Sequence, residues 1–568
     1  MKTLIFIAMA GMLVFSSCKK APQFGGFQLA DQFSGDPGTV DSIQASSLFA
    51  PITCKAPLAK GLRAWRRLSN AEFKNTVTAV FGLTNVNYSG LTTDISHQDI
   101  YDTLMVPSNY VNEQRFGTFR AVAKDIASKV DLAKTFPCLS SGVGCILTTS
   151  KTLAEKAWRR PLLDVEVAGL AAVFTGTQAD VGPEQAARFV IEAIVLAQSF
   201  LYRSELGIKA ADGTYTLSDY EMASALSYSI LRKPPDDTLL ALAKSKSLSS
   251  RAAITAQVNR LFADPQAKSA WKDFASMWLD SNKILEADRT GIAEFTPALA
   301  AAASKETGDL FADTLSKKTG GTLNALLTSD SIPSSNVLST IYSSVAANGI
   351  LKFKETDRRG PLGLASFLIA TSAVDHTSPV KRGVFVLKRL MCSNFAPFAK
   401  ASLPPKTATQ TNRDVYLGLE KGSCGGCHKP MNDIGFIFEN FDMMGRYRTT
   451  ADSQPITVAS APKLDGDVVD VSSMSDFLTA LGQSKQVQEC YARQIFRYSF
   501  GRSELTPMPV IGAAANTIIK LPTQVEVDNC QLRDGIDAME AGGGDLKATL
   551  IAFLTSDAFR KRIDRKPL

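Results

Sequence analysis

Cys424-Gly425-Gly426-Cys427-His428 is the stretch that decides how this chain is built. It is a C-x-x-C-H box, the attachment signal for c-type haem. The two thiols can add to the haem vinyl groups, and the adjacent histidine is then placed to ligate the iron. With nine cysteines and three histidines in 568 residues, a chance match is expected in roughly one such chain in a thousand. The box predicts one covalently bound haem c, with His428 as an axial iron ligand.

Two other uses of a C-x-x-C pair stay open, a zinc half-site and a disulfide. Zinc takes about four nitrogen or sulfur ligands, usually with a second paired cluster. No such cluster is visible, because His97 and His376 stand alone in the sequence. A thioredoxin-like pair would need a βαβ setting, whereas this box is expected in a glycine-rich loop between helical segments.

The second axial ligand is open among three methionines, in the order Met444, Met474 and Met443. Met431 is too near the box to wrap round a haem. His376 would give bis-histidine ligation, and its other interpretation is a residue flanking a helix. A thioether ligand raises the potential and suits electron transfer. An open position would instead suit oxygen or peroxide chemistry.

Charged residues follow the box closely. Arg446 and Arg448 are predicted to contact haem propionates, since guanidinium groups suit carboxylates, or else to lie on the surface. Asp433, Glu439 and Asp442 suggest acid–base chemistry at first sight. The preferred interpretation is that they cap turns and pair with those arginines. No phosphate-binding loop, nucleophile elbow or catalytic triad is evident.

The amino terminus predicts export. Residues Met1–Ser17 carry one lysine and a short apolar run, typical of a signal peptide rather than a spanning helix. The run ends at a site close to a bacterial lipobox, which predicts lipidation of Cys18. The alternative is an ordinary secretory signal with an incidental cysteine. Lys19 follows, which favours the outer membrane of a Gram-negative bacterium, facing the periplasm or the surface. The mature protein is thus expected to be anchored to a membrane by lipid, and residues 19–55 should be a tether.

Cysteine usage agrees with an oxidising compartment. Once Cys18 and the box are set aside, an even number of cysteines remains, which suggests disulfides. Cys138 with Cys145 would close a small loop, and Cys490 with Cys530 is the second expected pair. Cys54 with Cys392 is what remains. Free buried thiols are the alternative for each pair.

Composition excludes some classes of protein. The hydrophobic fraction of 45% supports sizeable cores. The net charge of +7 is mild and the basic residues are interspersed with acidic ones, so no nucleic-acid partner is expected.

Local patterns predict a mainly α chain with several domains. Leu68–Phe73 and Leu217–Met222 are capping boxes with hydrophobic staples. Ser378-Pro379 is typical of a helix start. The apolar positions from Val487 to Tyr498 predict a helix that ends at Gly501. A further helix is expected at 475–481 with Met474 in the loop before it, and a small β element near 456–471.

Five segments resemble a large exported bacterial family, abundant in planctomycetes and related groups, that is built from modules of unknown function around a cytochrome-c-like module. The resemblance covers most of residues 63–562 in unbroken order. It implies a c-type cytochrome, but it implies no particular substrate. The segments are RAWRRLSNAEFKNTVTAVFG from Arg63; AEKAWRRPLLDVEVAGL from Ala154; YTLSDYEMASALSYSILRKPPDDTLLALA from Tyr215 with AWKDFASMWL from Ala270; TSPVKRGVFVLKRLMC from Thr377 with CGGCHKPMNDIGFIFENFDMMGRYR from Cys424; and YARQIFRYSFGR from Tyr491 with SDAFRKR from Ser556.

The expected organisation leaves three functions to weigh. The first is electron transfer with an unidentified redox partner protein, the second a haem-dependent oxidase or peroxidase, and the third a cell-surface binding protein with accessory haem. The size favours more than simple electron carriage, for which about 100 residues suffice. The expected segments are a signal peptide (1–18), a tether (19–55), three helical modules (56–150, 151–210 and 211–350), a cytochrome-c-like module (355–480) and a carboxyl-terminal helical module (481–568).

Overall fold

The computed structural model describes residues 41–44, 49–54, 61–96, 101–355, 357–395, 406–407, 409–421, 424–506, 508–511, 518–521 and 525–563. The expected signal peptide, Cys18, most of the tether and His97 lie outside these residues. The described chain is mainly helical with small sheets, as the sequence predicts. None of its helices has the length and apolarity needed to cross a bilayer.

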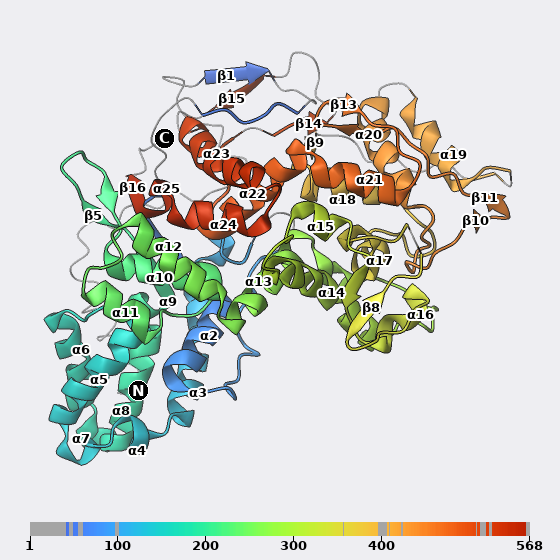
Figure 1. The fold of residues 1–568 in the computed structure, drawn as a ribbon. Helices are drawn as coiled ribbons and strands as arrows, with labels where there is room; N and C mark the ends of the chain where they lie inside the picture. Colours follow the sequence, from blue (N-terminus) through green and yellow to red (C-terminus); the bar gives the residue numbers. More distant parts are fainter. Residues whose placement is uncertain are drawn as a thin grey trace.

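The amino-terminal third of the chain is a helical bundle with its own apolar core, in blue to teal in Figure 1. Its helices are α2 (Asn70–Phe81), α3 (Glu113–Lys129), α4 (Leu132–Thr135), α5 (Val143–Trp158), α6 (Asp164–Thr175), α7 (Gln178–Val181), α8 (Pro183–Leu196) and α9 (Gln198–Leu201). Helix α8 packs against both α3 and α6. The Phe73 ring of α2 lies 4.9 Å from Phe119 and 5.5 Å from Phe200, centroid to centroid. Because α5 runs across residue 150, the two modules expected here share one core.

The rest of the chain surrounds a second, larger core. Its helices are α10 (Asp219–Leu231), α11 (Asp237–Lys244), α12 (Arg251–Phe262), α13 (Pro265–Trp278), α14 (Pro297–Ser316), α15 (Leu323–Leu327), α16 (Ser339–Tyr342), α17 (Ala365–Ala370), α18 (Pro379–Arg389), α19 (Asn412–Leu417), α20 (Gly425–Gly435), α21 (Met474–Gln483), α22 (Lys485–Phe500), α23 (Val525–Ala541), α24 (Leu546–Thr555) and α25 (Asp557–Arg560). Helix α22 crosses the centre of the molecule (Figure 1).

Aromatic side chains join α22 to α13. The ring centroids of Trp278 and Tyr491 lie 5.5 Å apart, and those of Phe274 and Tyr498 lie 5.1 Å apart. Such spacings are typical of favourable edge and tilted aromatic pairs. The periodic residues of α22 are therefore core residues, as expected from their spacing.

Local sequence signals set several helix ends as predicted. Ser69 and Glu72 form the capping box of α2, and Gly82 ends that helix in a left-handed conformation. Ser218 and Glu221 repeat the box at α10. Helix α18 has Ser378 as its N-cap and Pro379 in its first turn, and Gly501 closes α22. The structure therefore confirms these predicted helix ends. Each signal works locally, because the capping residue satisfies backbone groups within one turn of the helix.

The last strand of the described chain forms a sheet with strands that come much earlier in the sequence. Strand β16 (Lys561–Ile563) pairs in parallel with β2 (Gly61–Leu62) and antiparallel with β6 (Tyr215–Thr216), which continues to β5 (Ile208–Lys209). A buried ion pair of 2.8 Å joins Arg562 to Glu205 beneath it. The carboxyl-terminal strand β16 thus joins strands that flank the amino-terminal bundle in the sequence.

The remaining strands form short ladders. The β element predicted near 456–471 appears as the hairpin of β12 (Lys463–Leu464) with β13 (Asp467–Val468). A second hairpin, β10 (Thr450–Ala451) with β11 (Gln454–Pro455), lies just before that range. The other pairs are β1 (Asp41–Gln44) with β15 (Ile518–Leu521), β3 (Ala64–Arg67) with β4 (Tyr202–Glu205), β7 (Ser331–Pro333) with β8 (Ile350–Lys352) and β9 (Asn394–Phe395) with β14 (Val510–Ile511).

Only one of the expected cysteine pairings is right. Cys138 and Cys145 form a disulfide as predicted. The other two bonds join Cys54 to Cys530 and Cys392 to Cys490, so both remaining expected pairs are wrong.

Packing of α22 explains the exchange of partners. This helix lies against the end of α18, where the Gln486 side chain donates to the Met391 carbonyl over 2.9 Å. Cys490 on the same helix therefore reaches Cys392. The Ile52 backbone amide donates to Glu489 over 3.1 Å, which brings the segment that contains Cys54 close to α22 and leaves it to pair with Cys530.

Candidate functional site

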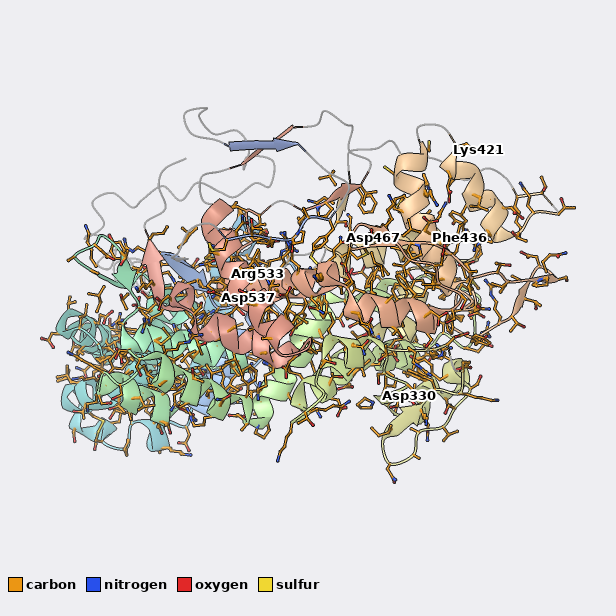
Figure 2. All side chains as sticks on the ribbon, turned by 45° about the horizontal axis from the view of Figure 1, so that its top comes forward. Asp330, Lys421, Phe436, Asp467, Arg533 and Asp537 are labelled. Atoms are coloured by element: carbon orange, nitrogen blue, oxygen red, sulfur yellow. A yellow bond between two sulfur atoms is a disulfide. The ribbon has the colours of Figure 1, made fainter. Side chains whose placement is uncertain are left out.

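The C-x-x-C-H box lies at the start of a helix rather than in a loop. Cys424 is the N-cap of α20, and the remaining box residues form its first turn. The expectation of a loop was wrong at this point, since two glycines did not prevent helix formation. Figure 2 shows Lys421, just before the box, on the outer rim of the molecule and Phe436, just after α20, nearer its body.

Helix α20 is held against α18 by direct backbone contact. A Cβ atom added to Gly383 would lie 1.9 Å from the Met431 carbonyl oxygen, and one added to Gly435 would lie 2.0 Å from that of Pro379. A side chain at either position would force the helices apart. The orientation of the box is thus fixed by two glycines.

The two box cysteines are free thiols. Cys424 is exposed and Cys427 is partly buried, whereas the other six described cysteines form disulfides. Burial, together with the neighbouring Cys424, raises the pKa of the Cys427 thiol. Residues three apart on a helix lie on the same side, so both sulfur atoms face one region beside α20.

The two ring nitrogens of His428 have different surroundings. Its Nδ1 atom is buried without a hydrogen-bond partner. Its Nε2 atom is not enclosed and makes no hydrogen bond to described residues. Burial lowers the pKa of His428, and the nearby Glu420 carboxylate opposes this shift. A neutral imidazole with an available nitrogen is the form that binds a metal.

These residues fit a c-type haem. The thiols are unpaired and accessible from outside, and Cys427 packs against the larger core. His428, whose Nε2 atom makes no hydrogen bond to described residues, follows directly on the second thiol. No group of three or more His, Cys, Asp or Glu side chains in the described part of the chain is arranged to hold a metal ion.

The arginines after the box have protein partners. Arg446 bonds to Asp442 over 2.9 Å and lies 3.8 Å from Glu294. Arg448 donates to the Glu439 backbone oxygen over 3.3 Å, and the two side chains are 3.9 Å apart. Asp442 and Glu439 therefore pair with the arginines after the box, as expected from the sequence.

Asp433 differs from the other two carboxylates. It bonds to Lys429 one turn earlier on α20, at 3.0 Å, rather than to an arginine. Burial raises the pKa of Asp433. The i, i+4 spacing within the helix explains this choice of partner.

Two buried arginines that no sequence motif marks hold the loop after α20. Arg382 donates to the carbonyl groups of Phe438 and Phe441 over 2.7 and 3.0 Å. Burial lowers the pKa of Arg382 to about 10. Arg358 donates to Gly445 over 2.8 Å and lies over the Phe441 ring. An arginine whose partners are mostly carbonyl groups leaves no charge pattern in a sequence, so only its neighbours reveal its role.

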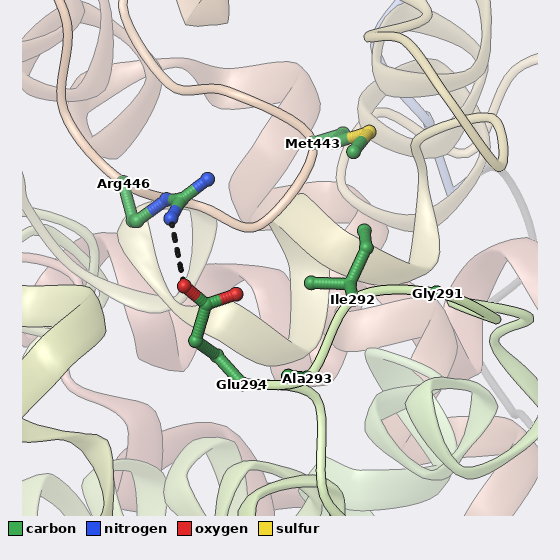
Figure 3. Close-up of a pocket in the computed structure, with 6 residues that line it drawn as sticks. All are labelled: Gly291, Ile292, Ala293, Glu294, Met443 and Arg446. Atoms are coloured by element: carbon green, nitrogen blue, oxygen red, sulfur yellow. Dashed lines mark ion pairs between the residues drawn. The ribbon is translucent and has the colours of Figure 1, made fainter.

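The methionines differ in accessibility. Met431, Met444 and Met474 are buried in the larger core. Met474 is the first residue of α21 and not part of the preceding loop, since Ser473 is the N-cap. Met443 is only partly buried and lines a shallow open hollow with Gly291–Glu294 and Arg446, shown in Figure 3. The hollow is crossed by the ion pair between Glu294 and Arg446.

His376 lies in the segment before α18. Its Nδ1 atom is 2.6 Å from Asp375, and its side chain is 46% exposed. This placement matches a residue that flanks a helix.

Three parts of the chain match known family models. The model PSD5 matches residues 145–205, PSD4 matches 217–343 and PSCyt3 matches 358–451; each is described as a protein of unknown function (DUF1595, DUF1592 and DUF1588). The chain is a multidomain protein. Its box and α18 to α20 lie within the PSCyt3 match. No curated protein and no solved structure matches the chain.

Proposed function

We propose that this protein is an exported, lipid-anchored c-type cytochrome that carries one haem and transfers electrons outside the cytoplasm. Cys424 and Cys427 would hold the haem through thioether bonds, and His428 would ligate the iron through Nε2. The haem would supply one-electron redox chemistry. The chain's own residues would hold the haem through Cys424 and Cys427 and would set the orientation of His428 through the packing of α20.

The observation that carries the proposal is the state of the box. Its two cysteines are the free thiols of a described chain whose other cysteines are all in disulfides. They stand on the same side of a helix, followed by a histidine with one free nitrogen. A disulfide role would leave the adjacent histidine unexplained. A zinc role would need about four ligands, and the described residues offer no group of His, Cys, Asp or Glu side chains arranged to hold a metal ion.

Two further findings support it. The name of the PSCyt3 model suggests a cytochrome-like module at residues 358–451. The three disulfides agree with an oxidising compartment, where c-type haem attachment takes place. The lipid anchor at Cys18 and the outer-membrane location rest on the amino-terminal sequence alone.

A methionine remains the expected second axial ligand. Met443 is the partly buried member of the three, while Met444 and Met474 would have to leave core positions or meet the haem within the core. Arg446 and Arg448 would contact haem propionates only after releasing their carboxylate partners.

The burial of Met444 and Met474 favours a second function, a haem-dependent oxidase or peroxidase. If both thioethers stay in the core and Met443 stays in its hollow, the sixth iron position is open to oxygen or peroxide. Carbon monoxide separates the two functions, since it binds ferrous haem readily only where that position is free.

The direct test is expression in a host with cytochrome c maturation, followed by a pyridine haemochrome assay. We expect one haem per chain that resists acid–acetone extraction. Cys424→Ala and Cys427→Ala should each lose one thioether bond, while Cys138→Ala, outside the module, should keep full haem content. Haem that is extracted by acid acetone from the wild type would contradict the proposal.

A further inference from the structure

The loop that carries Met443 and Met444 is closed on itself. The Asp442 side chain accepts from the backbone amides of Met444 and Arg446 over 2.8 and 2.9 Å. The Asp442 amide in turn donates to the Arg446 carbonyl over 2.9 Å. Gly445 has a φ of +76°, in the left-handed region that glycine adopts without strain. The loop therefore has a defined shape, and its orientation depends on what attaches it to the core.

Arg358 attaches this loop to the core. Its side chain is fully buried, and Nη2 donates over 2.8 Å to the carbonyl of Gly445, the residue that follows Met444. Its guanidinium carbon lies 4.6 Å from the centroid of the Phe441 ring and 4.9 Å from that of Tyr342. A cation over an aromatic face is stabilised most where water is excluded. The guanidinium is thus fixed in place directly beside the loop.

The same guanidinium reaches the segment beside Met474. Its Nη1 atom donates to the Gly363 carbonyl over 2.8 Å. Gly363 lies against this methionine, because a Cβ atom added to the glycine would be 3.5 Å from the Met474 Cε atom. A single buried cation therefore neighbours both segments that supply the candidate axial methionines.

The charge of Arg358 is only partly compensated. Among the described residues, Glu355 supplies the carboxylate that pairs with it, at 3.4 Å from Nε. The other two guanidinium nitrogens bond to carbonyl groups, which are neutral. A charge inside a protein acts over a longer distance than one in water, because the surrounding dielectric constant is lower.

We infer that Arg358 is a positioning residue of the proposed haem site, which holds the methionine loop in place and raises the reduction potential of the iron through its positive charge. This inference rests on the proposed function, with one of the three methionines as the axial ligand. Ferric iron carries one more positive charge than ferrous iron, so a nearby cation disfavours the ferric state.

The charge effect is tested with Arg358→Gln and Glu355→Gln, which remove opposite charges from one ion pair. The midpoint potential is measured by spectroelectrochemical titration and the haem content by pyridine haemochrome. At the wild-type midpoint, Arg358→Gln should show roughly a tenfold excess of ferric over ferrous protein, equivalent to a midpoint lower by about 59 mV. Glu355→Gln should raise the midpoint. A purely structural role would not give shifts of opposite sign.

Arg358→Lys separates the charge from the hold on the loop. Lysine keeps the positive charge but lacks the planar fork that bonds to two carbonyl groups at once. The midpoint should therefore stay near that of the wild type, while the backbone amides of Gly445 and Arg446 exchange with deuterium faster.

Arg159 provides a matched control in the amino-terminal core. It is also buried, donates to the Ser199 and Tyr202 carbonyl groups over 2.6 and 2.8 Å, and lies 5.6 Å from the Tyr228 ring centroid. Arg159→Gln should lower the stability of the protein in urea and leave the midpoint unchanged.

The possible failures are distinguishable. Full haem content with an unchanged midpoint in Arg358→Gln, or shifts of the same sign in Arg358→Gln and Glu355→Gln, would overturn the inference. So would a wild type that carries covalent haem without a methionine ligand. Absence of covalent haem from the wild type would instead overturn the proposed function. If Arg358→Gln yields no holoprotein, Glu355→Gln decides: a raised midpoint supports the role of Arg358, and an unchanged or lowered midpoint overturns it.

Discussion

Gly383 in α18 lies in direct contact with the Met431 carbonyl in α20, so close that a Cβ atom would fall 1.9 Å from that oxygen. The helix that carries the box is therefore positioned by the absence of a side chain on its neighbour. Overpacking at such a contact usually costs about 1–3 kcal/mol.

Gly383→Ala should accordingly lower the stability of the module and shift α20 away from α18. We expect earlier unfolding in urea and reduced haem content per chain. Gly418→Ala is the matched control, because Gly418 has helical dihedrals and no atom within 4 Å of an added Cβ. Equal stability of the two variants would contradict the packing described here.

Glu306 should make stability depend on pH. It is fully buried on α14, accepts from the Ser366 amide over 2.8 Å and bonds to the Tyr342 hydroxyl. Burial raises its pKa to about 7 from 4.5. The folded state therefore holds this proton more tightly than the unfolded state, and its contribution is full below pH 4.5 and lost as the pH rises through 7.

The lost contribution amounts to about 3 kcal/mol if the whole shift is realised. Urea unfolding between pH 4.5 and 8 measures it, and Glu306→Gln should flatten the decline. Glu286→Gln, at an exposed position, should leave the profile unchanged. A profile for Glu306→Gln that still falls like the wild type would rule out this carboxyl as the cause.

Cys18→Ser should release the protein from membranes, since the lipobox-like site is its expected anchor. Fractionation of cells followed by detection of the protein in the soluble fraction measures this. Cys138→Ser serves as a control that removes a cysteine without touching the site. A Cys18→Ser variant that stays in the membrane pellet would place the anchor elsewhere.

Replacement of Met443, Met444 or Met474 by Leu should identify the second axial ligand. Leucine nearly conserves volume, which limits the loss of stability at the two buried positions to less than about 1.5 kcal/mol. The oxidised wild type should show the long-wavelength sulfur-to-iron band, and one variant should lose it together with a lower potential. If the wild type has no such band and binds carbon monoxide readily, the oxidase or peroxidase function is favoured.

Local signals made much of the fold predictable. Ser69 with Glu72 and Ser218 with Glu221 bond to backbone within the same turn, so the helix starts follow from residues three apart. The candidate site could be located in the sequence for the same reason, because the box is five contiguous residues.

Long-range features were not predictable. The bond between Cys54 and Cys530 spans 476 residues, and nothing local distinguishes it from other pairings. Arg358 and Arg382 resemble surface residues by composition, yet they are fully buried among carbonyl groups and rings. The contact of Glu420 with Gly425 likewise depends on how two helices meet.

The central claim is covalent attachment at the box, and intact-protein mass spectrometry under denaturing conditions tests it most directly. The mature wild type, from a host with cytochrome c maturation, should weigh more than its polypeptide by one haem, and its proteolytic peptide should carry that haem on both Cys424 and Cys427. The mass of the bare polypeptide, with these two cysteines free or joined to each other, would contradict the claim.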